Sequence, residues 1–274
     1  LNIRGKDKFN KIIEKIIRCI NGYTIYFIRI VLISNKMKGD FIMLRKLESA
    51  KMGSSNLGWL RSKFHFSFAE YYNPNNMGFG VLRVINDDLI NPNTGFDTHP
   101  HQNMEIISYV VKGELTHGDS MGNKGNLKRG NVQYMSAGTG VYHSEHNLGE
   151  EVARFLQIWI LPDKEGHKPN YGEYKFEWND RKNKWLHMVS SNQGEAVIKV
   201  NQDINIFTLE LDEGSAIEYH VKAARQAYLV QIEGKSNING IILNERDAME
   251  IVEEDIKIKS EVLSHFIILE MKKA

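Results

Sequence analysis

The body of the chain, from residue 43 onward, is a succession of short apolar segments separated by turn residues. The segments are rich in Ile, Val, Phe, Tyr and Leu and are bounded by Gly, Asn or Asp, which is typical of β-strands joined by short turns. Convincing long helical periodicity is missing from this pattern. The expected strands cover residues 104–111, 131–135, 153–161, 196–200, 204–211, 227–232 and 264–271.

Two similar domains account for this pattern better than one. Many short strands at even spacing are typical of sandwiches and barrels, and the body is long enough for two domains of about 100 residues each. The segment ISYVVKG at 107–113 is echoed by YLVQIEG at 228–234, and both precede a similar turn. We therefore expect an all-β protein with two tandem barrels, 43–165 and 166–274. Chance similarity between hairpins is the alternative, and the Gly-, Pro- and charge-rich stretch 163–184 is the expected connection.

The first 42 residues differ from the body in composition. Ile, Lys, Asn, Phe and Tyr, whose codons are largely A and T, fill 26 of the 42 positions, and a Lys-Gly-Asp stretch stands shortly before Met43. We therefore expect residues 1–42 to be a non-native or disordered extension, translated from an A/T-rich region upstream of a natural start at Met43. The alternative is an amphipathic helix, because apolar residues recur at helical spacing between Phe9 and Ile20.

Charge and cysteine content exclude several classes of function. The whole chain has a formal net charge of +1, but the residues after 42 carry 26 Lys or Arg against 31 Asp or Glu, so the body is mildly acidic. This balance argues against a nucleic-acid surface. The one cysteine, Cys19, rules out an intramolecular disulfide framework and a cysteine-based zinc cluster. With no apolar stretch of the roughly 20 residues that span a bilayer, we expect a cytoplasmic protein without nucleic-acid or membrane partners.

Two pairs of residues carry the candidate chemistry. His99 and His101 are two positions apart, and His143 and Glu145 repeat that spacing. Side chains at i and i+2 of a strand point to the same side, so each pair presents both donors to one point. Three imidazoles and one carboxylate suit a first-row divalent transition metal better than Ca²⁺ or Mg²⁺. The alternative reading makes these histidines surface or hydrogen-bonded core residues.

The motifs around these pairs resemble those of the pirin family, within the cupin superfamily. Gly95, the His-Pro-His of 99–101, Glu105 and Gly113 are similar to the first cupin motif, and MSAGTGVYHSE at 135–145 is similar to the second in its pirin form. The Gly-x-x-x-His-x-Asp-Ser-x-Gly that begins at Gly113 adds to the likeness. The resemblance covers residues 43–274 and implies two tandem cupin barrels with one metal, in the first barrel.

By this resemblance the metal ligands are His99, His101, His143 and Glu145. In many other cupins the glutamate of the first motif is the ligand, so Glu105 is the alternative to Glu145. We prefer Glu145, because it shares a strand face with His143. Glu105 would then accept a hydrogen bond from a ligand or be a polar core residue.

The remaining candidate residues have weaker signals. We expect His117 and Asp119 to be turn residues of the family pattern, with a hydrogen bond to a metal ligand as the alternative. His65 and His146 have no partner at ligand spacing, so we expect them to be structural or on the surface.

The second barrel is expected to hold no metal. Aligning Gly234 with Gly113 brings His220 onto His99, but it brings Lys222 onto His101 and Gln226 onto Glu105. A cation in place of a ligand opposes metal binding. We expect this barrel to pack against the first and close one side of its mouth.

The resemblance implies an activity like that of quercetin 2,3-dioxygenase, the oxidative cleavage of a flavonol with release of carbon monoxide. We expect a small aromatic substrate, a monomer, and Fe(II) as the metal, with Mn, Ni, Co, Cu and Zn as alternatives. Glu145 is the expected catalytic residue, accepting the proton of the substrate hydroxyl. The competing expectation is a metal-dependent protein-binding, transcriptional co-regulator without turnover. A third is a metal-binding protein that acts on another phenolic compound or metabolite.

Overall fold

The computed structural model describes residues 43–273, and the extension expected at 1–42 lies outside the described residues. Over the described range the elements are strands β1–β22 and two 3-10 helices, η1 (Ser49–Lys51) and η2 (Trp178–Arg181), with no α-helix. The strands form four sheets, antiparallel except for the pairing of β13 with β14. The all-β class expected from the sequence is confirmed.

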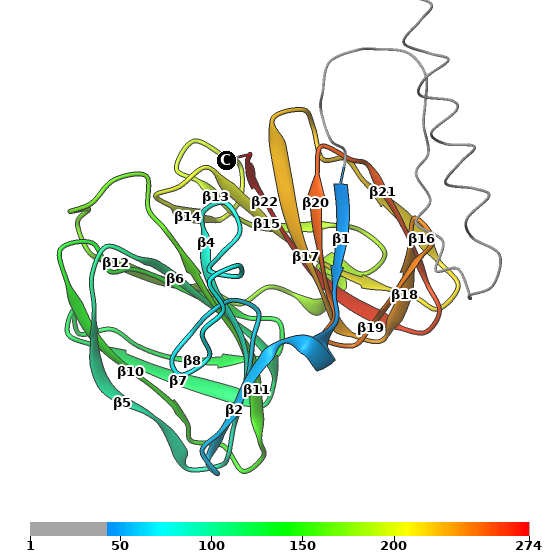
Figure 1. Cartoon of the computed structure of the whole chain (residues 1–274). Coiled ribbons are helices and arrows are strands. Elements are labelled where there is room, and N and C mark those ends of the chain that lie inside the picture. Colours follow the sequence, from blue (N-terminus) through cyan, green and yellow to red (C-terminus); the bar gives the residue numbers. More distant parts are fainter. Residues whose placement is uncertain (1–42, 274) are drawn as a thin grey trace, which may run out of the picture. The chain divides into compact units, whose positions relative to one another are not determined.

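Two of the sheets make an N-terminal sandwich, drawn mainly in cyan and green in Figure 1. Its seven-stranded sheet has the order β12 (Asn170–Tyr174), β9 (Val132–Ser136), β6 (Glu105–Lys112), β11 (Ala153–Ile160), β4 (Leu82–Ile90), β3 (Leu60–Phe64), β2 (Gly53–Asn56). Its four-stranded sheet has the order β5 (Thr94–His101), β10 (Val141–Asn147), β7 (Glu114–Asp119), β8 (Lys124–Lys128).

The other two sheets make a C-terminal sandwich, drawn mainly in yellow to red in Figure 1. Its seven-stranded sheet has the order β1 (Met43–Leu47), β20 (Ala248–Val252), β17 (Arg225–Glu233), β22 (Ser264–Lys272), β15 (Ile204–Leu211), β13 (Leu186–Ser191), β14 (Ile198–Val200). Its four-stranded sheet has the order β16 (Ala216–Tyr219), β21 (Ile256–Ser260), β18 (Lys235–Ile238), β19 (Ile241–Asn244).

The internal repeat seen in the sequence corresponds to equivalent strands. β6 and β17 hold the same place, because the order β9-β6-β11-β4 in one sheet matches β20-β17-β22-β15 in the other. Each of the two strands is followed by a glycine with positive φ, Gly113 at +70° and Gly234 at +85°, a conformation that favours glycine. The repeat therefore reflects two copies of one topology, each built as a pair of sheets.

Strand pairing departs from the boundary expected at residue 165 in two places. β1 pairs with β20, so the first described strand belongs to the C-terminal sandwich, as Figure 1 shows for the blue β1 beside the orange β20. β12 pairs with β9, so residues 170–174 of the expected connection complete the N-terminal sheet. Each sandwich thus takes one edge strand from sequence that the turn signals assign to the other.

The largest hydrophobic cluster lies between the two seven-stranded sheets. It joins Ile107 and Ile158 of the N-terminal sheet to Val230 and Ile267 of the C-terminal one. Smaller clusters fill the interior of each sandwich. Because side chains alternate along a strand, β6 has one face toward the C-terminal sandwich and the other toward the interior of its own.

Within the described residues no helix is long and apolar enough to cross a bilayer.

Candidate metal centre

Three of the four expected ligands converge on one point. His99 and His101 lie on β5 and His143 lies on the neighbouring β10, where His143 is the register partner of His99. The ring centroids are 4.5 Å apart for His99 and His143, and 4.9 Å apart for each of the other two pairs. One nitrogen of each ring lies within 4.8 Å of those of the other two. We call these three residues the outer donor set.

The hydrogen bonding of these rings fits a divalent metal ion. Nδ1 of His99 lies 2.7 Å from the carbonyl oxygen of Asp97, an arrangement that fixes a ring and leaves Nε2 for another partner. Both nitrogens of His143 are buried without a hydrogen-bond partner in the described structure. Burial lowers the pKa of His143 to about 2, reinforced by His99, His101 and His117, and burial together with His99 lowers the pKa of His101 to about 4. Both imidazoles are therefore neutral near pH 7, the form that binds metal.

Glu145 is completely buried beside His143 and is held by donors from three adjacent strands. Oε1 of Glu145 accepts hydrogen bonds from Oγ of Ser108 at 2.8 Å and from Nε2 of Gln133, and its Oε2 accepts one from Nε2 of Gln157 at 2.7 Å. Gln157 pairs with Ser108, and Ser108 with Gln133, so the donors form one row across β11, β6 and β9. Burial raises the pKa of Glu145, although the bond from Ser108 and the proximity of His117 oppose that shift.

This row, which we call the polar row, was not anticipated from the sequence. Its signal is nonetheless present, because Ser108, Gln133 and Gln157 are each a polar residue between two apolar or aromatic neighbours. In the C-terminal sandwich the position that corresponds to Ser108 in the repeat is Leu229, which belongs to that sandwich's hydrophobic core.

Glu105, the alternative ligand, points away from the metal centre. Its carboxylate accepts hydrogen bonds from Oγ of Ser136 at 2.7 Å and from the backbone and side-chain amides of Asn201 at 3.1 and 3.2 Å. On β6, Ser108 reaches Glu145, whereas Glu105 and Tyr109 lie on the opposite face, toward the C-terminal sandwich. Glu105 is therefore a buried polar residue of the contact between the sandwiches and lies outside the outer donor set.

His117 and Asp119 form a buried pair beside Glu145. Nε2 of His117 lies 3.1 Å from Oδ2 of Asp119, and both side chains have no exposed surface. The ring of His117 stacks on Tyr171 with centroids 4.3 Å apart, and its centroid is 5.5 Å from that of His143. The two residues lie on strand β7 and inside the sandwich, whereas the sequence pattern favoured a turn.

Gly95 allows β5 and β10 to approach closely. A Cβ atom at this position would collide with the carbonyl oxygen of Glu145 and the Cα of His146. Backbone atoms cannot give way as a flexible side chain can, so a side chain at Gly95 would push β10 away. The register of the two strands also shifts between His143 and Glu145, an irregularity that is frequent next to functional sites.

An apolar surface lies on the other side of His101. The ring of Trp159 stands edge-on to His101 at 4.8 Å and to Phe68 at 5.4 Å. Trp159 is partly exposed and packs on a cluster that contains Ile106 and Met135. The outer donor set therefore has a polar interior side and an aromatic side.

The remaining histidines lie outside the outer donor set. His65 is buried, with Nδ1 3.0 Å from the Tyr228 hydroxyl of the C-terminal sandwich, so it is structural. His146 is partly exposed and lies 3.4 Å from Asp97. In the C-terminal sandwich His220 and Lys222 are exposed, and His220 pairs with Asp255 at 3.0 Å. Within the described residues no donor group of that sandwich converges as the outer set does.

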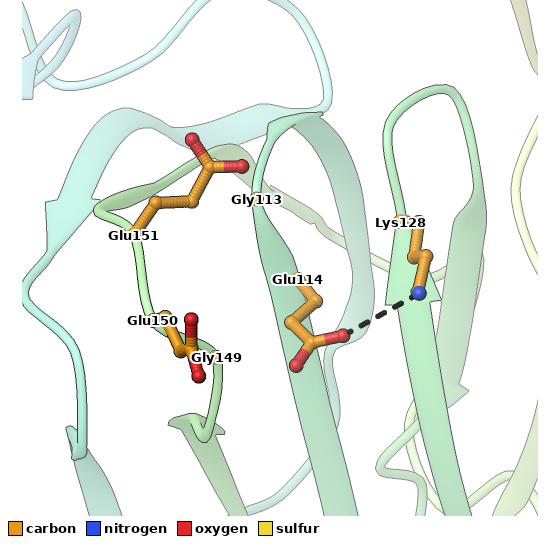
Figure 2. A pocket seen from close by; sticks show the side chains of 6 residues that line it. All are labelled: Gly113, Glu114, Lys128, Gly149, Glu150 and Glu151. Atoms are coloured by element: carbon orange, nitrogen blue, oxygen red, sulfur yellow. Dashed lines mark ion pairs between the residues drawn. The ribbon is translucent and has the colours of Figure 1, made fainter.

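A surface pocket of about 600 Å³ lies elsewhere on the N-terminal sandwich, where the β6–β7 turn meets the β10–β11 turn. Figure 2 shows the Glu114 carboxylate of β7 paired with Lys128 of the neighbouring strand β8 at this pocket, with Glu150 and Glu151 on the other turn. The paired atoms of Glu114 and Lys128 are 3.8 Å apart. No member of the outer donor set lines it. It is a separate, mostly acidic hollow.

Comparison with known proteins gives consistent matches over the described chain. Residues 43–160 match the family model described as Pirin, and residues 187–271 match the one described as Quercetinase C-terminal cupin domain. A pirin-like protein of Caulobacter vibrioides is 44% identical over 75% of this chain and 89% of its own length. The quercetin 2,3-dioxygenase of Escherichia coli is 41% identical over 78% of this chain and 90% of its own length.

Solved structures agree with these matches. The crystal structure of the bacterial pirin YhhW of Escherichia coli in complex with nickel(II) superposes with a TM-score of 0.80 at 36% identity, covering 85% of this chain and all of that one. The two sheet pairs are therefore tandem cupin domains of the jelly-roll type, as expected. The sheets are packed face to face and are not closed barrels.

Proposed function

The chain belongs to the pirin family, and on that premise we propose that it is a metal-dependent dioxygenase that cleaves flavonol-type substrates. The observation that carries the proposal is the outer donor set, three imidazoles around one point, with the buried carboxylate of Glu145 beside it. The names of relatives with about 40% identity support the reaction class.

We propose that His99, His101, His143 and Glu145 hold one divalent transition-metal ion, with Fe(II) as the native metal. The donor set of imidazole and carboxylate suits such an ion, and the buried nitrogens of His143 have no other partner among the described residues. When bound, the ion supplies Lewis-acid and redox chemistry at the focus of the histidines. The nickel(II) in the structure of the relative supports a divalent ion without selecting iron.

Glu145 is the proposed proton acceptor. In the overall reaction a flavonol takes up O₂ and is converted to a ring-opened ester and carbon monoxide, and it begins with loss of the proton of the flavonol hydroxyl. Burial raises the pKa of Glu145, which makes it a stronger base than an exposed carboxylate. Its Oε2 accepts one hydrogen bond, from Gln157, and so keeps one lone pair, which would take the proton when it does not bind the metal ion.

The polar row keeps this base in place. Ser108, Gln133 and Gln157 are buried and bond the carboxylate from one side, so they fix its rotamer while the other side stays toward His143. On the aromatic side, Trp159 and Phe68 offer a wall next to His101 on which a planar substrate can stack. These residues bind and orient the substrate, and the row holds the group that takes its proton.

The test is turnover of quercetin under air by metal-loaded protein, followed by loss of flavonol absorbance and by carbon monoxide released. The same metal at the same concentration without protein is the blank, because flavonols oxidise slowly on their own. Glu145→Gln keeps an oxygen donor but loses the basic carboxylate, so we expect partly retained metal and turnover lower by about 10²-fold or more. Ala at any one of the three histidines should lower the metal affinity enough for the purified protein to lose most of its metal.

Glu105→Gln is the matched control, because this carboxylate is equally buried but points to the other sandwich. We expect a smaller effect on metal content and on turnover. If Glu105→Gln strips the metal and Glu145→Gln does not, the assignment of the ligand is wrong. If the metal-replete wild-type protein turns over no flavonol, the dioxygenase proposal fails, and a metal-dependent protein-binding role or another phenolic substrate takes its place. The monomeric state and the cytoplasmic location stay predictions.

A further inference from the structure

His117 has the surroundings of a metal ligand. We propose that His117, His143 and Glu145 form an inner donor set that holds one divalent transition-metal ion when the outer donor set is lost. This inference rests on the proposal that the histidine cluster binds metal, and it adds a ligand to that cluster. Because the two sets share His143, we expect one ion per chain, held by one set or the other.

The first support is geometric. One donor atom from each of His117, His143 and Glu145 lies within 4.8 Å of the other two, and all three residues are buried. They come from adjacent strands, because His117 of β7 is the register partner of Glu145 of β10. The pairing of a β-ladder therefore fixes the imidazole opposite the carboxylate.

The second support is the hydrogen bonding of His117. One ring nitrogen, Nε2, faces the Asp119 carboxylate at 3.1 Å, and the other, Nδ1, is buried with no partner among the described residues. Asp119 is itself fixed by the backbone amides of Met121 and Asn123 and by the Asn123 side chain, at 2.9 to 3.1 Å. A carboxylate that holds one nitrogen while the other stays free is the usual arrangement behind a metal-binding imidazole.

The third support is the position of the Glu145 carboxylate. Its oxygens group with His117 and His143 and not with His99 and His101. The polar row holds them there with three hydrogen bonds. The carboxylate is thus already placed for the inner set.

Charge favours the same placement. The inner set includes the carboxylate of Glu145 and lies against that of Asp119, and both side chains are buried. Two such carboxylates compensate the charge of a divalent ion, whereas the outer donor set contains imidazoles and no carboxylate. A buried ion requires this compensation. The competing explanation is that His117 is only a packing residue for Tyr171, on which it stacks.

The experiment removes the outer set and asks whether metal binding survives. The double variant His99→Ala/His101→Ala changes two partly exposed residues and leaves the inner set intact. It is stripped of metal and titrated with Co²⁺, which is followed by calorimetry and by the visible absorption of the bound ion. We expect one Co²⁺ per chain, bound more weakly than by the wild-type protein.

Two further changes in that double variant test His117 directly. His117→Gln should abolish the remaining Co²⁺ absorption. Asp119→Asn, which keeps the size of the side chain, should weaken binding by about 10- to 100-fold, and it serves as the second variant if His117→Gln unfolds. His146→Gln is the matched control, because His146 is on β10 beside a carboxylate but in neither set, and it should leave the affinity unchanged. Thermal unfolding of each metal-free variant verifies that it is folded.

The inference is overturned if the double variant binds no Co²⁺, or if His117→Gln and Asp119→Asn leave its affinity within twofold. Such a result leaves flavonol turnover by the wild-type protein untouched, since that activity is measured with the outer set present. Conversely, the wild-type protein could show no flavonol turnover while the double variant binds Co²⁺ in a way that depends on His117. That result would refute the dioxygenase proposal and support the inner donor set.

Discussion

Tyr109→Phe removes a single oxygen atom from the contact between the two sandwiches. The Tyr109 hydroxyl accepts a hydrogen bond from Nη1 of Arg181 at 2.5 Å and lies 2.8 Å from Nε2 of His265 on β22. Tyr109 and Arg181 have no exposed surface and His265 is 2% exposed, so water cannot replace the lost oxygen. The substitution leaves one guanidinium N–H of Arg181 without its partner, and it leaves Nε2 of His265 with only the Thr208 hydroxyl, 3.2 Å away.

The expected cost is about 3 kcal/mol. A hydrogen bond to a charged group contributes about 2 kcal/mol, and the imidazole adds about 1 kcal/mol. For a chain of this size each kcal/mol lowers Tm by about 2–4 °C, so Tm should fall by about 6–12 °C. Trp178 packs against His265 and Arg181, and its fluorescence therefore reports on the same contact.

The assay is thermal unfolding of the metal-free protein, followed by circular dichroism and by tryptophan fluorescence. Tyr134→Phe is the matched control, because the Tyr134 hydroxyl accepts one bond from Asn170 at 2.7 Å in a partly exposed place where water can substitute. It should cost less than about 1 kcal/mol. If Tyr109→Phe lowers Tm no more than Tyr134→Phe does, the buried network does not stabilise the contact and the reasoning is refuted.

The remaining predictions concern the packing of β5 and a buried acid. Gly95→Ala should lower metal affinity and Tm, because its Cβ would collide with the backbone of β10. Gly118→Ala is the control and should leave both nearly unchanged, because its Cβ meets only Oγ of Ser144 at 3.5 Å. Equal losses of affinity in calorimetry and of Tm in thermal unfolding for the two variants would contradict this. Asp88 is buried, which raises its pKa to about 7 from 3.8, so the folded state binds more protons between those values and loses stability as pH rises through them. Asp88→Asn should therefore stabilise the protein by an amount that grows from about pH 4 to pH 7 and stays constant above. Denaturant unfolding at both pH 4 and pH 8 should show the larger gain in the free energy of unfolding at pH 8. A larger gain at pH 4 would contradict the raised pKa of Asp88.

Local patterns determined the parts of the site that lie within one strand. The i, i+2 spacing of His99 with His101 and of His143 with Glu145 places each pair on one side of its strand, which holds whatever the strand packs against. The β class and the repeat also follow from local alternation and turn residues. For the same reason Ser108 and Gln157 could have been suspected, as polar residues in apolar strands.

Pairing between distant strands decided the rest. Counting from His101 to Glu105 does not predict where Glu105 points, because the chain turns at Asn103, whose φ is +49°, and the alternation begins again on β6. The inner position of His117 depends on the register of β7 with β10. The placement of β1 and β12 depends on which sheet edges are open. Side-chain alternation is a property of neighbouring residues, so the sequence carries it; register and the choice of sheet edge are set by contacts between residues far apart in the chain, so they become fixed only when the sheets assemble.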